Sequence, residues 1–172
     1  MVNSEKNKFL LDTNAFIEAY RTYYGFDILP TFWKHLSEKS KEGKLLVLDV
    51  VKKEILQNDD ELSAWIKAQK DLSTIKASDF DEEYKQIENY VRECGFYTAK
   101  AWKNWANNDG ADPWLIAAGM KTGFTVVTRE KPSGGLNKKI LSKNPKIPDV
   151  AKYFHVETID TFAMMRRLKI KI

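Results

Sequence analysis

Phe9-Leu10-Leu11-Asp12-Thr13-Asn14 is the stretch that decides the fold. Three apolar residues followed at once by an acid are typical of a short buried strand with a carboxylate at its C-terminal end. Residues 15–21 then have helical spacing, so Asp12, Thr13 and Asn14 are predicted to form a turn between strand and helix. Ligands bind outside the carboxyl ends of strands in open α/β sheets. The stretch therefore predicts an α/β fold with an acid at its functional edge.

A second apolar run repeats this pattern. Residues 44–48 are predicted to form a buried strand, and Asp49 is predicted to cap a helix over residues 50–57. Glu54 lies within the first two turns of that helix. A second acid thus follows a second strand.

The C-terminal third of the chain supplies two more strands, over residues 124–128 and 156–159. Glu130 follows the first of them, and Asp160 is predicted to cap the last helix. Strands that alternate with helices predict a parallel sheet covered on both faces.

The middle of the chain reads as a helical insertion or flank, over about residues 59–107, with no chemistry of its own. Asn58-Asp59-Asp60 is predicted to end the preceding helix and to cap the first helix of this segment, over residues 61–70. Its aromatic residues are spaced as in a buried helix face or a dimer interface, although such residues can also stack on bases.

Length and composition favour one domain, spanning residues 1–172. No window approaches the roughly 18 apolar residues of a membrane helix, and the N-terminus lacks the apolar core of a signal peptide, so a cytoplasmic location is expected. Cys94, His35 and His155 are too few to build a closed zinc site.

The net charge of +4 and the pI of about 9.0 permit nucleic-acid binding without requiring it. The basic residues are unevenly distributed: two clusters lie over residues 129–146 and 166–171. In the first cluster Glu130 is the one acid, among Arg129, Lys131, Lys138, Lys139, Lys143 and Lys146.

Five acids sit just after a strand or near the start of a helix: Asp12, Glu54, Asp112, Glu130 and Asp149. If they converge in space, they repel one another unless a cation lies among them. A set of oxygen ligands favours Mg²⁺ or Mn²⁺ over zinc.

Each acid also has a simpler explanation that spacing alone leaves open. Asp12 can form an Asx turn, and Asp112, before a proline, can be an N-cap. Glu54 can be a solvated helix residue, and Glu130 can pair with the neighbouring Arg129 or Lys131. Asp149 can stabilise the N-terminus of a helix by its interaction with the helix dipole.

Four blocks of the chain resemble, in order, the motif blocks of PIN-domain nucleases: residues 9–14, 50–55, 111–118 and 125–130. Residues 130–132 and 147–150 are similar to those of a prokaryotic PIN subfamily near the VapC-type toxins. The resemblance covers nearly the whole chain.

This resemblance implies a three-layer α/β/α PIN-like fold with a central parallel sheet of four or five strands, and a ribonuclease that uses Mg²⁺ or Mn²⁺. Asp12, Glu54 and Asp112 match the three principal acids of the family. Thr13 and Asn14 would support Asp12 through hydrogen bonds.

The fourth block departs from the family pattern. Many members have Thr-x-Asp where this chain has Thr128-Arg129-Glu130. The longer Glu130 would hold a second metal ion through water or would leave a site for one metal ion. Asp149 would supplement Glu130 as a metal ligand, and Thr128 would be a supporting residue of the site. Candidates for contacts with RNA phosphates are Arg129, Lys131, Lys138 and Lys139, and the alternative is a solvated basic loop.

The leading functional hypothesis is an endoribonuclease, and its more specific form is the toxin of a toxin–antitoxin pair with a cognate antitoxin as partner. One alternative is a PIN-like module that binds RNA or protein without turnover. Another is a structure-specific DNA nuclease. Proteins of this kind commonly dimerise, so a homodimer is a further expectation.

Overall fold

A computed structural model describes residues 7–107 and 110–172, and its centre is a five-stranded parallel sheet. The strand order is β3-β2-β1-β4-β5, and each neighbouring pair is parallel. The strands are β1 (Phe9–Leu11), β2 (Leu45–Leu48), β3 (Thr74–Ile75), β4 (Thr125–Val127) and β5 (Thr158–Ile159).

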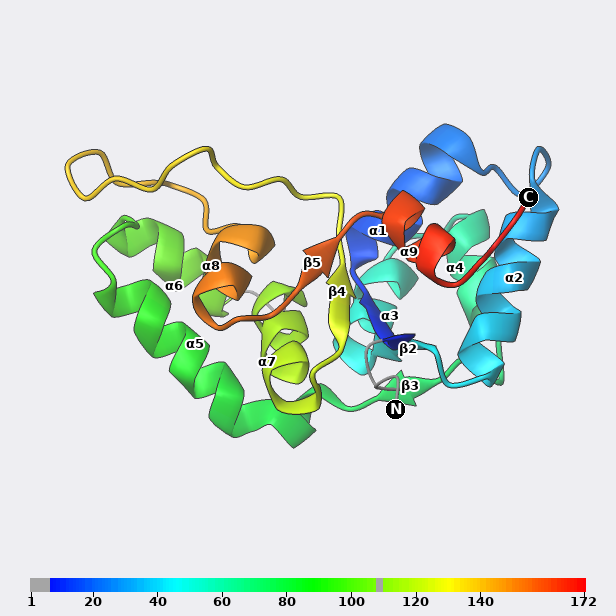
Figure 1. The fold of residues 1–172 in the computed structure, drawn as a ribbon, viewed down its shortest axis with the longest axis horizontal. Coiled ribbons are helices and arrows are strands. Elements are labelled where there is room, and N and C mark those ends of the chain that lie inside the picture. Colours follow the sequence, from blue (N-terminus) through cyan, green and yellow to red (C-terminus); the bar gives the residue numbers. More distant parts are fainter. Residues whose placement is uncertain (1–6, 108–109) are drawn as a thin grey trace.

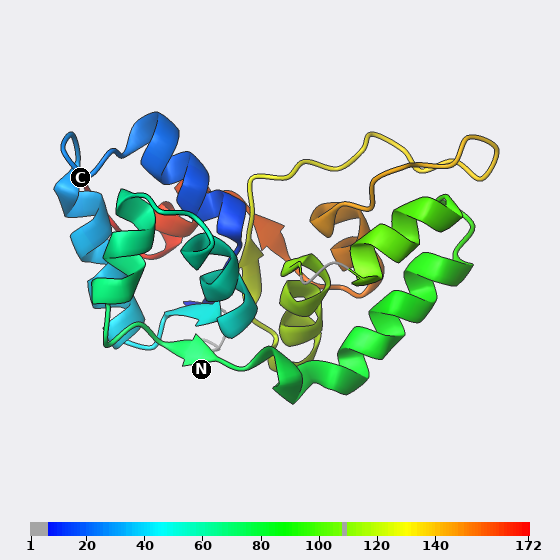
Figure 2. The ribbon, with the colours of Figure 1, turned by 180° about the vertical axis from the view of Figure 1, so that it is seen from behind.

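Helices cover both faces of the sheet, as Figures 1 and 2 show from opposite sides. In Figure 1, α1–α4 and α9 lie to the right of the sheet and α5–α8 to its left, which gives the predicted three-layer α/β/α arrangement. One layer contains α1 (Thr13–Glu18), the π-helix η2 (Ala19–Tyr23), α2 (Pro30–Lys41), α3 (Asp49–Leu56), α4 (Glu61–Ala68) and α9 (Thr161–Arg167). The rest are η3 (Ala77–Phe80), α5 (Asp81–Glu93), α6 (Ala99–Asn107), α7 (Asp112–Thr122) and α8 (Ile147–Tyr153).

The strand order creates a switch point between β1 and β4. The chain adds β2 and β3 on one side of β1 and then returns to add β4 and β5 on the other side. Because parallel crossovers are right-handed, the two halves place their helices on opposite faces. Their connections diverge at the carboxyl ends of β1 and β4, where open sheets of this kind bind ligands.

The sheet is held by apolar burial at its centre. Phe9 and Leu10 of β1 are fully buried, and β1 pairs in register with both neighbours, for example Phe9 with Leu45 and with Thr125. A strand buried on both faces reads as an unbroken apolar run, which is why this strand was predictable.

Helix α7 packs unusually close to the chain segment that leads into β5. A Cβ atom added at Gly119 would lie 2.5 Å from Cγ1 of Val156, so no larger side chain fits without a shift. Gly123 then ends α7 with a left-handed φ of 73°. This close packing fixes the axis of the helix that carries Asp112.

Two of the three predicted caps are confirmed. The carboxylate of Asp60 accepts the N–H of Ser63, and that of Asp160 accepts the N–H of Ala163. The prediction for Asp49 is wrong, because Asp49 is the first residue of α3, not its cap. Its Oδ1 instead accepts the N–H of Ala77 at 2.8 Å, which ties α3 to η3.

Strand β3 was not predicted. It lies inside the segment predicted to be a helical flank, and its two residues, Thr74 and Ile75, are exposed and half-buried. So short a strand carries no hydrophobic period, and its position depends on pairing with β2.

In the described part of the chain, no helix is long and apolar enough to cross a bilayer. The N-terminal residues 1–6, which bear on the signal-peptide prediction, lie outside it.

Candidate functional site

Asp12 and Thr128 meet across the switch point of the sheet. Asp12 follows β1 and is 1% exposed, and Thr128 follows β4 and is 3% exposed. The hydroxyl of Thr128 donates to Oδ2 of Asp12 at 2.8 Å and accepts the N–H of Glu130 at 3.1 Å. This pair links the ends of two neighbouring strands.

Glu54 braces the site from α3. Its Oε1 accepts the N–H of Ala111 at 2.8 Å, and its Oε2 accepts the hydroxyl of Thr13. Thr13 and Ala111 directly adjoin Asp12 and Asp112 in the chain, so Glu54 fixes the two aspartates relative to each other. The alternative that Glu54 is a solvated helix residue is wrong, because both of its carboxylate oxygens accept hydrogen bonds from other parts of the chain.

The two predicted supporting residues next to Asp12 act differently from expectation. Thr13 donates its hydroxyl to Glu54, not to Asp12. The side chain of Asn14 is exposed and makes no hydrogen bond to Asp12 in the described structure. The backbone N–H of Asn14 lowers the pKa of Asp12. The Asp12 side chain does not form a cap hydrogen bond to the start of α1.

Asp112 opens α7 without capping it. The N-cap is Ala111, and no side-chain cap bond is formed, so the capping alternative does not explain Asp112. Its carboxylate is therefore not committed to the helix end.

The electrostatics show which acids the fold brings together. The pKa of Asp12 is raised to about 6, mainly by burial and also by the negative charges of Glu130 and Glu54, while the hydrogen bond from Thr128 opposes the rise. The pKa of Asp112 is raised to about 7, mainly by burial and in addition by the charges of Asp12, Glu130 and Glu54. Asp12, Glu54, Asp112 and Glu130 thus form one interacting group, which we call the carboxylate cluster.

Glu130 and Asp149 are placed differently. Oε2 of Glu130 accepts the N–H of Ile147 at 2.7 Å, which connects the cluster to the first residue of α8. Asp149 accepts the N–H and hydroxyl of Ser133 and is not among the groups that act most on the pKa of Asp12 or Asp112. The structure does not bring Asp149 to the carboxylate cluster.

The carboxylate cluster is not a preformed metal cage. Over residues 7–107 and 110–172, no three His, Cys, Asp or Glu side chains are grouped so that they could hold a metal ion. One oxygen each of Glu54 and Glu130 is turned to a backbone N–H. Magnesium, however, is typically held by one or two carboxylates and several waters. Buried, mutually repelling oxygen donors at Asp12 and Asp112 fit that kind of binding.

Trp105 is a residue of the site that the sequence did not reveal. Its side chain is 8% exposed, and its indole N–H has no hydrogen-bond partner in the described structure. The group lies near Asp112 and lowers its pKa, but the two do not reach hydrogen-bonding geometry. A buried unpaired donor is uncommon and calls for an explanation. Helical spacing predicted that this aromatic residue lies in the core or in a dimer interface, and no local motif marks it as part of the site.

The predicted phosphate-binding cations divide into two pairs. Arg129 and Lys131 line a cavity of about 450 Å³ beside α1 and α9, and Nε of Arg129 pairs with Glu18 at 2.8 Å. This ion pair means that Arg129 is engaged by Glu18 and not by Glu130.

Lys138 and Lys139 lie farther along the loop, which runs from β4 over α5 and α6 (Figure 1). The ammonium of Lys138 lies 5.5 Å from the ring centroid of Phe96, and Lys139 is exposed. The loop is held there by backbone hydrogen bonds from Ser142 to Phe96 and from Thr98 to Ser142.

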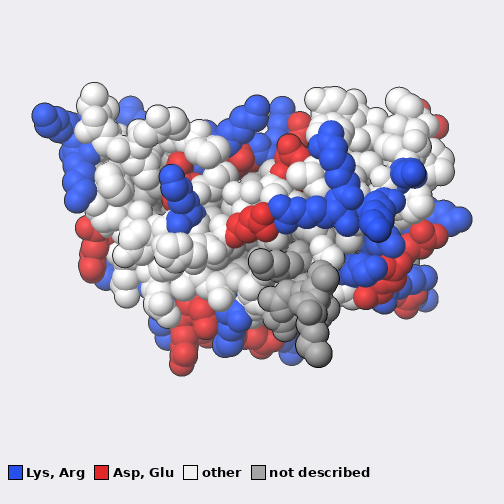
Figure 3. All heavy atoms as spheres, in the orientation of Figure 1, with Lys and Arg blue, Asp and Glu red and all other residues white. Residues whose placement is uncertain are grey.

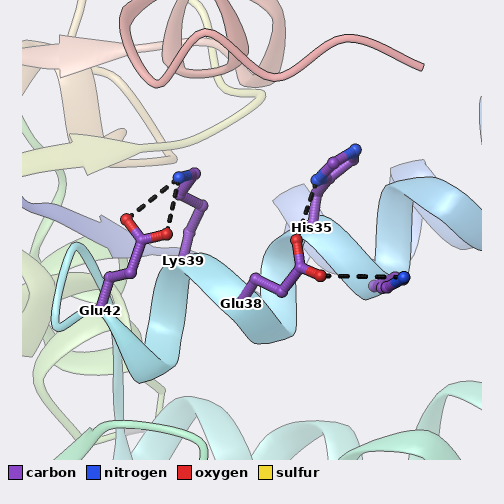
Figure 4. Close-up of polar contacts among 5 residues, drawn as sticks. His35, Glu38, Lys39 and Glu42 are labelled. Carbon is purple, nitrogen blue, oxygen red and sulfur yellow. Dashed lines mark hydrogen bonds and ion pairs between the residues drawn. The ribbon is translucent and has the colours of Figure 1, made fainter.

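Charged side chains of both signs are mixed on one face of the molecule (Figure 3). On the face drawn in Figure 3, acidic groups lie near the top centre with Lys and Arg on both sides. Figure 4 shows ion pairs along α2, where His35 contacts Glu38 at 3.2 Å and Lys39 contacts Glu42 at 2.8 Å. Pairs spaced three residues apart on an exposed helix stabilise that helix modestly.

Comparison with known protein families identifies the family to which this chain belongs. The model of a family described as a domain of unknown function, DUF4411, matches residues 9–172. No curated protein matches the chain. The matched range contains the whole sheet and all four members of the carboxylate cluster. The chain therefore belongs to the DUF4411 family.

Proposed function

We propose that this protein is a Mg²⁺- or Mn²⁺-dependent endoribonuclease. The observation that carries the proposal is the carboxylate cluster at the switch point, where Asp12 and Asp112 have pKa values raised toward neutrality. Strongly perturbed acids in the ligand-binding crevice of an α/β sheet are candidates for chemistry. The resemblance of the four motif blocks to PIN-domain nucleases supports RNA as the substrate.

In this proposal Asp12 and Asp112 hold the cation. When bound, such an ion polarises a phosphate and lowers the pKa of a water molecule, so that hydroxide forms near neutral pH. Thr128 keeps the Asp12 carboxylate in one orientation through its hydrogen bond. Glu54 fixes the positions of Asp12 and Asp112 relative to each other through its hydrogen bonds with Thr13 and Ala111.

The surrounding groups serve the substrate. Arg129 and Lys131 neutralise backbone phosphates next to the cluster, and such contacts add affinity without sequence preference. The indole N–H of Trp105, which has no partner among the described residues, offers a hydrogen-bond donor beside Asp112. Glu130 fixes the start of α8 and adds negative charge to the cation site.

The test is cleavage of labelled single-stranded RNA, single-stranded DNA and flap DNA with and without Mg²⁺ or Mn²⁺. We expect metal-dependent cleavage of RNA, lost in Asp12→Asn and retained in Asp149→Asn, a matched charge removal outside the cluster. Preferred cleavage of flap DNA would replace the proposal with a DNA nuclease, and RNA binding without turnover would replace it with a silent binding module. Growth arrest on expression of the wild type, but not of Asp12→Asn, would support a toxin role.

A further inference from the structure

A cavity beside the carboxylate cluster combines exposed aromatic rings with cations. It has a volume of about 450 Å³, within the range of small-ligand sites, and lies between η2, α9 and the segment after β4. Its lining includes Tyr23, Tyr24, Phe162, Arg129 and Lys131.

The aromatic side chains of the cavity are partly open to solvent. Tyr23 is 51% exposed and Phe162 is 43% exposed, although their rings lie 5.9 Å apart in an edge arrangement. Tyr24 is buried, and the centroid of its ring lies 4.3 Å from that of Phe32 in a stacked arrangement. Packing therefore holds this part of the cavity wall in place. Tyr23 is the last residue of the π-helix, a rare element that is frequent at functional sites.

The charged side chains lie on the same cavity. Arg129 bonds Glu18 through Nε, yet 64% of its side chain is exposed. Lys131 is exposed two residues farther on. Two acids also line the cavity: Glu18 is paired with Arg129, and Asp160 accepts the N–H of Ala163. An aromatic surface next to cationic side chains matches a nucleotide, which presents a flat base and an anionic phosphate.

The position of the cavity relates it to the carboxylate cluster. Glu18, on its wall, ends the helix that begins directly after Asp12, and six helical residues rise about 9 Å. Arg129, on another wall, lies between Thr128 and Glu130. A single strand that crosses the cluster would place a neighbouring nucleotide at this cavity.

We infer that the cavity lined by Tyr23 and Phe162 binds an unstacked base of single-stranded RNA, with Arg129 and Lys131 at its phosphate. The inference rests on the proposed ribonuclease function and names a base-binding subsite for it. Stacking on aromatic side chains tolerates any base, so the subsite selects single strands over duplexes and not a particular sequence.

The experiment measures binding of a short labelled single-stranded RNA in EDTA, so that no cleavage occurs. Phe162→Ala and Tyr23→Ala should each weaken binding by about 5- to 150-fold, the range expected for loss of one stacking partner. Phe162→Tyr should keep most of the affinity. Tyr153→Ala is the matched control, because Tyr153 is an aromatic residue of similar exposure, 59%, in a different cavity against Tyr90.

An abasic RNA of the same length separates base recognition from phosphate attraction. It should bind the wild type more weakly than normal RNA and should be insensitive to Phe162→Ala. If the wild type and both alanine variants bound RNA equally, with unchanged melting temperatures, the inferred subsite would be overturned. Metal-dependent cleavage of RNA by the wild type would still support the proposed function. Absence of both binding and cleavage in the wild type would overturn the proposed function together with it.

Discussion

Replacing Asp12 with Asn is expected to stabilise the folded protein in metal-free buffer at pH 8. The folded state raises the pKa of Asp12 from 3.8 to about 6, chiefly because the carboxylate is buried. One pKa unit corresponds to about 1.4 kcal/mol, so ionised Asp12 lowers the free energy of unfolding by up to about 3 kcal/mol. The amide of Asn is neutral and can still accept the hydroxyl of Thr128.

The sign of the pH dependence follows from the same values. Because the folded pKa lies above the unfolded one, the folded protein binds more protons between about pH 4 and pH 6. Wild-type stability from this group therefore falls as pH rises through that window and stays low above it. The advantage of Asp12→Asn should be full at pH 8 and should shrink toward pH 4.

Urea denaturation of both proteins at several pH values, in the presence of EDTA, measures this difference. A gain of about 2 kcal/mol corresponds to a rise of about 4–8 °C in melting temperature for a chain of this size. Asp149→Asn serves as the control: it removes a charge outside the carboxylate cluster and should give no such gain. If Asp12→Asn were no more stable than wild type at pH 8, or equally favoured at every pH, the electrostatic reasoning would be refuted.

Four further outcomes are expected. Millimolar Mg²⁺ or Mn²⁺ should raise the melting temperature of the wild type and have little effect on Asp112→Asn, because the cation binds only the folded state. Thr128→Val should destabilise the protein by about 1–3 kcal/mol in urea denaturation and weaken its response to Mg²⁺, because the Asp12 carboxylate loses a buried donor. Gly119→Ala should cost about 1–3 kcal/mol by overpacking, and most of the loss should be recovered when Val156→Ala is added. In RNA-binding titrations over salt concentration, Lys131→Ala should reduce affinity and salt slope more than Lys138→Ala, because Lys131 lies beside the cluster.

The sequence predicted those parts of the fold that depend on local pattern. Phe9-Leu10-Leu11 is an unbroken apolar run because β1 is buried on both faces. Asp60 and Asp160 were identifiable as caps because a cap bonds an amide only three residues away. Strand β3 escaped prediction because two residues carry no period.

The contacts within the site depend on tertiary placement and were less accessible. Glu54 reaches Ala111 across 57 residues and Thr13 across 41, and nothing in the local spacing indicates either bond. The acids could be chosen by their positions after strands, but their partners could not. Asp149 illustrates the limit, because its place near a helix start was as suggestive as that of Asp112, yet its carboxylate bonds Ser133.

The charge balance of the cluster gives the strongest physical reason to expect a cation. The charged groups that act most on the pKa of Asp12 and Asp112 are all carboxylates. Arg129 stands next to Glu130 in sequence, but its guanidinium pairs with Glu18. Buried acids are normally paired with a positive charge, because the cost of desolvation is otherwise uncompensated. Among the described residues, the groups that act most on these two pKa values include no cation, so protons, as the raised pKa values reflect, or a bound cation can neutralise the cluster. Since a proton on Asp12 is lost above about pH 6, Mg²⁺ should stabilise the wild type most strongly at alkaline pH and least at pH 5. If the stabilisation by Mg²⁺ did not change over this pH range, the cation would bind at a place other than the carboxylate cluster.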